Sequence, residues 1–200
     1  MLNHYTVIPV LSALLFVGLS VLIGWILTKA MKSRGFVTNQ AVILSVMTAF
    51  SVLLFLRFGW SVAAWQGLFL AAVLIYASCS DLTDHTVDDH VWVTVLALSL
   101  CSVATVGGMS MLIGGLCVFV PQIALSLLPP HKTLGGADIK LSTALAFLLG
   151  AWRGIAAYLL ALVIAVVFIS IRNRIKKQKN KKAFALVPFL AVGALLIFLI

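Results

Sequence analysis

The chain has 200 residues, of which 63% are hydrophobic, and its mean hydropathy is +1.19. Soluble domains average about 45–50% apolar residues and still expose much of their surface to solvent, so this composition excludes a water-soluble globular domain. Fourteen Lys and Arg against five acidic residues give a formal net charge of +9. We therefore expect an integral membrane protein with a basic surface.

Apolar runs separated by polar or Gly/Pro-containing breaks predict eight helices, over residues 6–29, 41–57, 61–80, 91–107, 110–128, 138–150, 154–171 and 184–200. A membrane-spanning helix needs about 20 residues, so the shorter ones imply tilt or a thinned bilayer. The first run is longer than the core of a signal peptide and no small-residue cleavage pattern follows it, which favours a retained helix. We expect one all-α membrane domain, with two N-terminal helices in residues 1–60 and a six-helix catalytic core in residues 61–200.

The basic residues predict the topology. Twelve of the fourteen Lys and Arg lie in or beside the first, third, fifth and seventh breaks, and only Arg57 and Arg153 lie in the even-numbered ones. The positive-inside rule places the odd breaks in the cytoplasm, so both termini are expected on the other side. We interpret the basic run 172–182 as an orientation signal beside anionic lipid headgroups and not as a nucleic-acid interface.

All five acidic residues are aspartates, and they lie in or beside the third and fifth breaks: Asp81, Asp84, Asp88, Asp89 and Asp138. The predicted topology places all of them on the cytoplasmic side. Asp81 ends one apolar helix and Asp138 opens another, and ionisable residues at membrane depth typically mark functional sites. Two such carboxylates could form a catalytic dyad, because like charges close together keep one of them protonated. The alternative is that both are interfacial helix caps.

Two glycines and a lysine flank Asp138. Gly135 and Gly136 could let the backbone approach a peptide strand closely, although a plain turn between helices is the alternative. Lys140 could pair with an aspartate, touch the backbone of a substrate or extend to the interface.

His85 and His90 lie among the acids, and two His with several Asp could hold a divalent ion. They share one short loop, however, and the chain has no helical HExxH pair, so we expect no metal and no other cofactor. Cys79, Cys101 and Cys117 sit singly in apolar runs, which predicts neither a zinc ribbon nor a disulfide framework.

Three segments resemble the type IV prepilin peptidases, which are membrane aspartyl proteases of the GxGD class. Residues 81–89, DLTDHTVDD, are similar to the family pattern of Asp, five residues, Ile or Leu, Pro, then Asn or Asp. Residues 135–141, GGADIKL, are similar to GxGDxKL. Residues 188–193, PFLAVG, are similar to part of the PFGPFLALG segment in the last helix. The eight-helix plan and a cytoplasmic site also fit this family.

The chain departs from the family pattern at several positions. Ala137 replaces the glycine before the aspartate, and the loop is expected to survive if its φ is negative. Asp88 replaces a proline, which predicts a less rigid turn before the fourth helix, while Ala185 and Val187 replace the first Pro and the Gly of the last motif. The loop 30–40 is short and lacks the paired zinc-binding cysteines of longer members, so N-methylation of the mature pilin is not expected.

The resemblance implies an endopeptidase of the bacterial cytoplasmic (inner) membrane that cuts a short basic leader, after a glycine, from prepilins or pilin-like proteins. Asp81 and Asp138 would activate water and protonate the scissile amide. Gly135, Gly136 and Lys140 would contact the substrate. The implied partners are the prepilin substrate, membrane lipid and pilus or secretion assembly proteins, and nucleic acid is not among them.

Two roles are open for the remaining three acids. Asp84, Asp88 and Asp89 could attract the positive charges of the leader, or they could be ordinary solvated loop acids.

Two other classes of function remain open on the residues alone. One is an ion- or proton-coupled transporter, because intramembrane acids often carry protons or ions. Transporters usually hold such acids near the midplane between internal repeats, whereas here they cluster at one interface. The other is a structural subunit of a pilus or secretion machine, which would need no second aspartate beside a Gly-Gly loop.

Overall fold

The computed structural model describes residues 4–36, 38–127, 135–176 and 185–200, and in these ranges it contains helices and no strand. In chain order the elements are α1 (His4–Ser33), α2 (Gln40–Phe58), α3 (Val62–Asp84), α4 (Asp89–Ser99), η1 (Leu100–Ser102), α5 (Val103–Val106), α6 (Gly108–Leu127), α7 (Gly136–Leu149), α8 (Ala151–Lys176) and α9 (Val187–Leu199). Because α4, η1 and α5 follow one another directly, they form one segment, and the described chain has eight helical segments as predicted.

Six of the described segments are long and apolar enough to cross a membrane. They are Val10–Ser33, Gln40–Phe58, Val62–Asp84, Asp89–Val106, Gly108–Leu127 and Ala151–Ile175. α9 is apolar but shorter, and the 14 residues of α7 are not among these six spans. Large apolar side chains cover the outside of the bundle, for example Leu56, Leu100 and Trp152. The prediction of an all-α polytopic membrane protein is confirmed.

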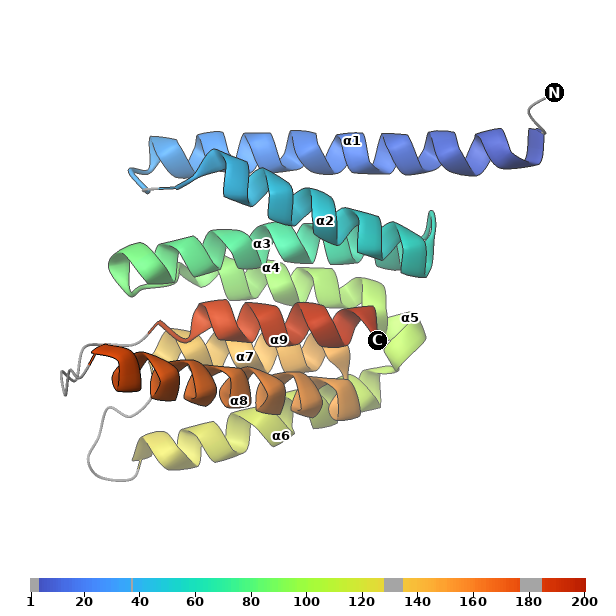
Figure 1. The fold of residues 1–200 in the computed structure, drawn as a ribbon. Coiled ribbons are helices and arrows are strands. Elements are labelled where there is room, and N and C mark those ends of the chain that lie inside the picture. The colour runs from blue at the N-terminus through green and yellow to red at the C-terminus, as the bar shows by residue number, and fades with distance from the viewer. Residues whose placement is uncertain (1–3, 37, 128–134, 177–184) are drawn as a thin grey trace.

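The helices lie roughly side by side, as Figure 1 shows, with α1 and α2 at one edge and α6 at the other. α3 is the most buried of the six spans. α9 packs against both α3 and α8, and α7 packs against α4, α6 and α8. The C-terminal end of α3 and the N-terminal ends of α4 and α7 meet at one end of the bundle, at the left in Figure 1. We call this the charged end, because it carries the five aspartates.

Polar and glycine residues define several helix ends. The Asn39 side chain accepts the N–H of Ala41 at the start of α2, and the Ser61 hydroxyl accepts the N–H of Ala64 at the start of α3. Gly150 separates α7 from α8 with φ of 83°, a value that favours glycine. These breaks occur where the sequence predicts them.

Small residues let neighbouring helices approach closely. A Cβ added at Gly193 in α9 would lie 2.6 Å from the carbonyl oxygen of Ala157 in α8, so the two backbones are in direct contact there. Such contacts are the usual means by which helices associate in lipid, where apolar burial provides little driving force.

Several predicted boundaries are wrong. The fourth helix, predicted as 91–107, is interrupted by the 3₁₀ turn Leu100–Ser102. α3 continues past residue 80 to Asp84, and α1 and α8 also extend beyond their predicted ends. Polar residues end an apolar run but do not break a helix, so a helix continues beyond its apolar part. The predicted break 129–137 and the basic run 172–182 lie partly outside the described residues, as does the predicted start of the last helix at 184.

Candidate active site

Asp81 lies in the last turn of α3, and only 7% of its surface is exposed. Its Oδ2 accepts a hydrogen bond of 3.0 Å from the backbone N–H of Val187, the first residue of α9. The first N–H groups of a helix have no acceptor within the helix. The Asp81 side chain provides the acceptor for one of them, so it caps α9 from a neighbouring helix. This contact places the Asp81 carboxylate in the interior of the bundle and anchors α9 to α3.

The backbone turns sharply after Asp81. His85 ends α3 in the left-handed conformation, with φ of 54° and ψ of 30°, and its N–H donates to the carbonyl oxygen of Asp81 at 3.1 Å. It is the one non-glycine residue with positive φ in the described ranges. The Ser80 hydroxyl donates to the carbonyl oxygen of Thr86 at 2.8 Å and holds the returning loop. A helix more often ends this way with glycine or asparagine, so His85 is held here by its surroundings.

Asp138 is the third residue of α7, after the N-cap Gly135. Its carboxylate accepts a hydrogen bond from the backbone N–H of Gly135, the arrangement that an acidic residue adopts in a capping box. A Cβ added at Gly135 would lie 3.0 Å from Oδ2 of Asp138, whereas one added at Gly136 would meet nothing within 4 Å. Gly135 has φ of −69°, so it is needed for space and not for an unusual conformation. The φ of Ala137 is also negative, which is the condition under which the sequence predicts that the loop survives.

The two carboxylates interact electrostatically. Burial raises the pKa of Asp138 to about 6, the negative charge of Asp81 adds to the rise, and the hydrogen bond from Gly135 opposes it. Two carboxylates that repel each other in this way favour a state in which one proton is held by the pair. The arrangement thus provides one group that can accept a proton and one that can donate it.

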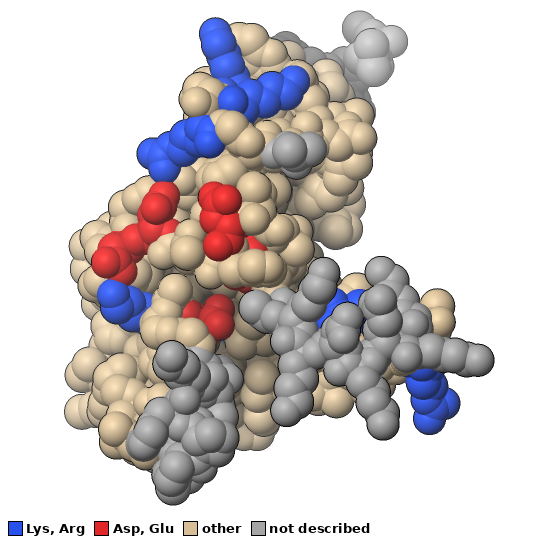
Figure 2. All heavy atoms as spheres, turned by 90° about the vertical axis from the view of Figure 1, so that its left-hand side faces the viewer, with Lys and Arg blue, Asp and Glu red and all other residues tan. Residues whose placement is uncertain are grey.

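The other three aspartates lie at the surface of the charged end, where Lys and Arg side chains gather beside them in Figure 2. Asp88 accepts hydrogen bonds of 2.9 Å from Arg34 and from the Tyr76 hydroxyl, which link the end of α1 to α3 and to the residue before α4. Asp84 is exposed, and no described residue forms an ion pair with it. The charge of Asp88 is therefore balanced, whereas no described residue balances that of Asp84.

Lys140 pairs with an aspartate, which is one of the three roles that its sequence left open. Its Nζ lies 2.7 Å from Oδ1 of Asp89, and the same oxygen accepts the indole N–H of Trp92 at 3.0 Å. The contact joins α7 to α4 beside Asp138. Asp89 is therefore not a free negative charge in this structure.

Three polar residues near Asp138 escaped the sequence analysis. Gln122 in α6 and Ser142 in α7 are both buried, and Gln122 Nε2 donates to the Ser142 hydroxyl at 2.8 Å. Tyr158 in α8 shares a hydrogen bond with Gln122 and interacts electrostatically with Asp138. Ser142 lies one helical turn beyond Asp138 on the same face of α7. A glutamine within an apolar helix is the signal that could have identified this cluster.

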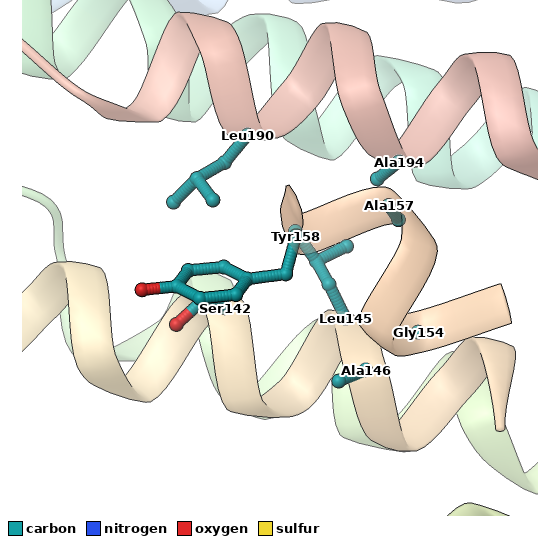
Figure 3. Close-up of a pocket in the computed structure, with 8 residues that line it drawn as sticks. All are labelled: Ser142, Leu145, Ala146, Gly154, Ala157, Tyr158, Leu190 and Ala194. Atoms are coloured by element: carbon teal, nitrogen blue, oxygen red, sulfur yellow. The ribbon is translucent and has the colours of Figure 1, made fainter. Parts of the chain in front are cut away.

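Figure 3 shows the small cavity beside these residues, with the hydroxyl groups of Tyr158 and Ser142 at the same end of it. The volume of about 10 Å³ is at the lower limit for a single water molecule. Leu190 and Ala194 of α9 close the opposite wall. The cavity is too small to hold a substrate side chain, so it is not a substrate pocket.

Metal ligation has no clear place in the described part of the chain. No group of three or more His, Cys, Asp or Glu side chains there is close enough to hold an ion. The Nε2 of His90 lies 3.7 Å from Oδ2 of Asp88, which Arg34 already contacts.

Comparison with protein families matches residues 68–170, just over half of the chain, to the type IV leader peptidase family. The matched range includes both Asp81 and Asp138. Comparisons with curated proteins and with solved structures gave no match.

Proposed function

Because the chain belongs to the type IV leader peptidase family, we propose that it is an aspartyl endopeptidase of the bacterial inner membrane that removes short basic leaders from prepilins or pilin-like proteins. One observation carries the proposal: Asp81 and Asp138, on different helices, are both withdrawn from solvent and interact electrostatically. Interfacial caps that served only the helix ends would not need to be coupled in this way.

The proposed reaction uses the two carboxylates with one proton between them. In the reactive form Asp138 carries the proton, which burial and the charge of Asp81 favour, and Asp81 is the ionised member, whose carboxylate accepts the Val187 N–H. Water attacks the scissile carbonyl carbon as Asp81 takes a proton from the water and Asp138 donates its proton to the carbonyl oxygen. When the carbon–nitrogen bond breaks, Asp81 protonates the leaving amine and Asp138 recovers its proton from the hydroxyl. The dyad thereby returns to its starting state. The proposed activity is this hydrolysis alone, without N-methylation of the product.

The charged end would face the cytoplasm, where the leader is located, and the apolar helix of the substrate would remain in the bilayer. The distribution of Lys and Arg supports this orientation. Asp84 supports the recognition of a basic leader, since its charge has no partner among the described residues.

The test is cleavage of a purified prepilin by the purified protein in detergent. The variants Asp81→Asn and Asp138→Asn should each abolish cleavage while the protein still inserts into the membrane and unfolds cooperatively. Asp88→Asn is the matched control: it removes an aspartate whose charge is balanced by Arg34, and it should keep cleavage at saturating substrate. Near-normal cleavage by either dyad variant would refute the assignment, and an inactive wild-type protein would refute the function itself.

A further inference from the structure

A basic pocket lies between the end of α1 and the start of α2, on residues that the proposed reaction does not use. Its volume is about 130 Å³, and it is lined by Trp25, Thr28, Lys29, Lys32 and Gln40. A single water needs about 10–15 Å³ on this measure, so the pocket admits a group of several heavy atoms.

The two lysines bring positive charge that the chain itself does not balance. All five aspartates lie within the described residues, and none of them forms an ion pair with Lys29 or Lys32. The Nζ of Lys29 lies over the ring of Trp25, 5.4 Å from its centre, and the Nζ of Lys32 lies 3.4 Å from Oε1 of Gln40. Both ammonium groups therefore border the pocket and remain open to an anion.

The remaining walls suit a polar group at the membrane interface. Lys29 and Lys32 occupy the end of the span Val10–Ser33, and Gln40 opens the span Gln40–Phe58. The N-terminal end of a helix favours negative charge, so α2 adds to the attraction of the lysines. Trp25 is about half exposed one turn deeper, and tryptophan is enriched at the level of lipid headgroups. Thr28 is buried, and its hydroxyl donates a hydrogen bond to the Trp25 carbonyl oxygen. It therefore lines the pocket without offering that proton to a ligand.

We propose that this pocket binds the phosphate of an anionic phospholipid. Lys29 and Lys32 contact the phosphate oxygens, the side-chain amide of Gln40 contributes a donor, and the Trp25 ring lies beside the glycerol and the first part of the acyl chains. Basic pockets between helices at a membrane surface recognise anionic headgroups in this way. The bound lipid holds the α1–α2 hairpin together at the charged end.

The experiment compares thermal unfolding of the full chain in nanodiscs of phosphatidylcholine with that in nanodiscs that also contain phosphatidylglycerol. Native mass spectrometry of the released protein counts the phosphatidylglycerol molecules that remain bound. The wild-type protein should unfold at higher temperature in the mixed discs and retain phosphatidylglycerol. The variant Lys29→Gln/Lys32→Gln should lose most of both effects. The matched control Arg153→Gln/Arg174→Gln also removes two positive charges, but from exposed positions outside the pocket, and it should behave as wild type.

Three results would overturn the proposal. The first is a lysine variant that responds to phosphatidylglycerol as strongly as the wild type, and the second is a control that loses as much as the lysine variant. The third is an equal rise in unfolding temperature when inorganic phosphate is added in uncharged detergent, since the ligand would then be a soluble anion and not a lipid.

Discussion

At the scale of single residues, the site depends on how a buried and a partly buried carboxylate obtain hydrogen bonds. Asp81 takes the N–H of Val187 from another helix, and Asp138 takes that of Gly135 from its own helix end. A buried carboxylate without such partners would be strongly destabilised as an anion. Each carboxylate thus accepts one backbone N–H, and the proposed division of roles assigns the proton to Asp138, whose pKa is raised to about 6.

Gly135 and Gly136 should respond differently to the same added methyl group. Gly135→Ala places a Cβ 3.0 Å from Oδ2 of Asp138, so the carboxylate must move, and kcat should fall by about tenfold. Gly136→Ala meets nothing within 4 Å, so it should leave kcat unchanged and alter KM if this glycine contacts the substrate. Steady-state kinetics of both variants provide the measurement, and equal effects on kcat would show that the spacing at Gly135 is unimportant.

Asp138→Asn should stabilise the protein at neutral pH while it abolishes cleavage. The pKa of Asp138 rises from 3.8 to about 6 on folding, so the native state loses stability as the pH rises through this window and the carboxyl becomes ionised. The neutral amide avoids this loss. After allowance for partial exposure, we expect a gain of about 1–2 kcal/mol above pH 6 and none below pH 4.

Unfolding of the wild type and the variant at pH 4 and pH 7.5 tests this prediction. Asp84→Asn, which neutralises an exposed aspartate, is the control and should show no such gain. A gain of the same size at both pH values would mean that ionisation of Asp138 is not its cause.

At the scale of elements, α7 is a short helix that is positioned by its neighbours. The Lys140–Asp89 ion pair joins it to α4, and the Gln122–Ser142 hydrogen bond joins it to α6. The ion pair is largely exposed, so solvent screening leaves it little influence on stability. The hydrogen bond is buried one turn from Asp138, and we expect it to govern the placement of that aspartate.

A double-mutant cycle with Gln122→Leu and Ser142→Ala should show coupling of about 1 kcal/mol, within the range known for hydrogen bonds between membrane helices. Unfolding in detergent gives the stability of the two single variants and the double variant. Because the hydrogen bond orients α7, kcat should fall in both single variants and KM should change little. If the stability losses of the two single variants add up to that of the double variant, the coupling is zero and the two side chains do not stabilise each other.

At the scale of the whole molecule, the acidic residues gather at one end of a strongly basic chain. Of the three exposed aspartates, Asp88 and Asp89 are paired with Arg34 and Lys140. Only Asp84 remains available to a basic leader among the residues described. The sequence left two roles open for the three exposed acids, attraction of a basic leader or ordinary loop charge, and among the described residues the first role is left to Asp84.

Asp84→Asn should raise KM for a substrate with a basic leader by a few-fold and leave kcat unchanged, because long-range attraction acts on association. The difference from wild type should disappear at high salt, where exposed charges are screened. A substrate whose leader lysines are replaced by glutamine is the control. An unchanged KM at low salt would remove electrostatic steering from the mechanism.

The sequence by itself determined the membrane class and the number of helical segments, and it predicted the candidate pair of aspartates. These properties follow from the apolar runs and the breaks between them. Hydropathy is a property of each residue, so it can be averaged along the chain without knowledge of the fold. The approximate starts of α2 and α3 were also predictable, because Asn39 and Ser61 are capping residues. The broken fourth helix was not, because no proline or glycine marks the 3₁₀ turn at Leu100–Ser102.

Only the tertiary structure decided how the candidate site is supported. It brings the Val187 N–H to Asp81, pairs Lys140 with Asp89, and joins Gln122 of α6 to Ser142 of α7. Each contact joins residues on different helices, and its formation depends on the packing angles and rotation of whole helices. Hydropathy and motif spacing contain no information on those angles, which is why the partners of the aspartates became visible only in the packed bundle.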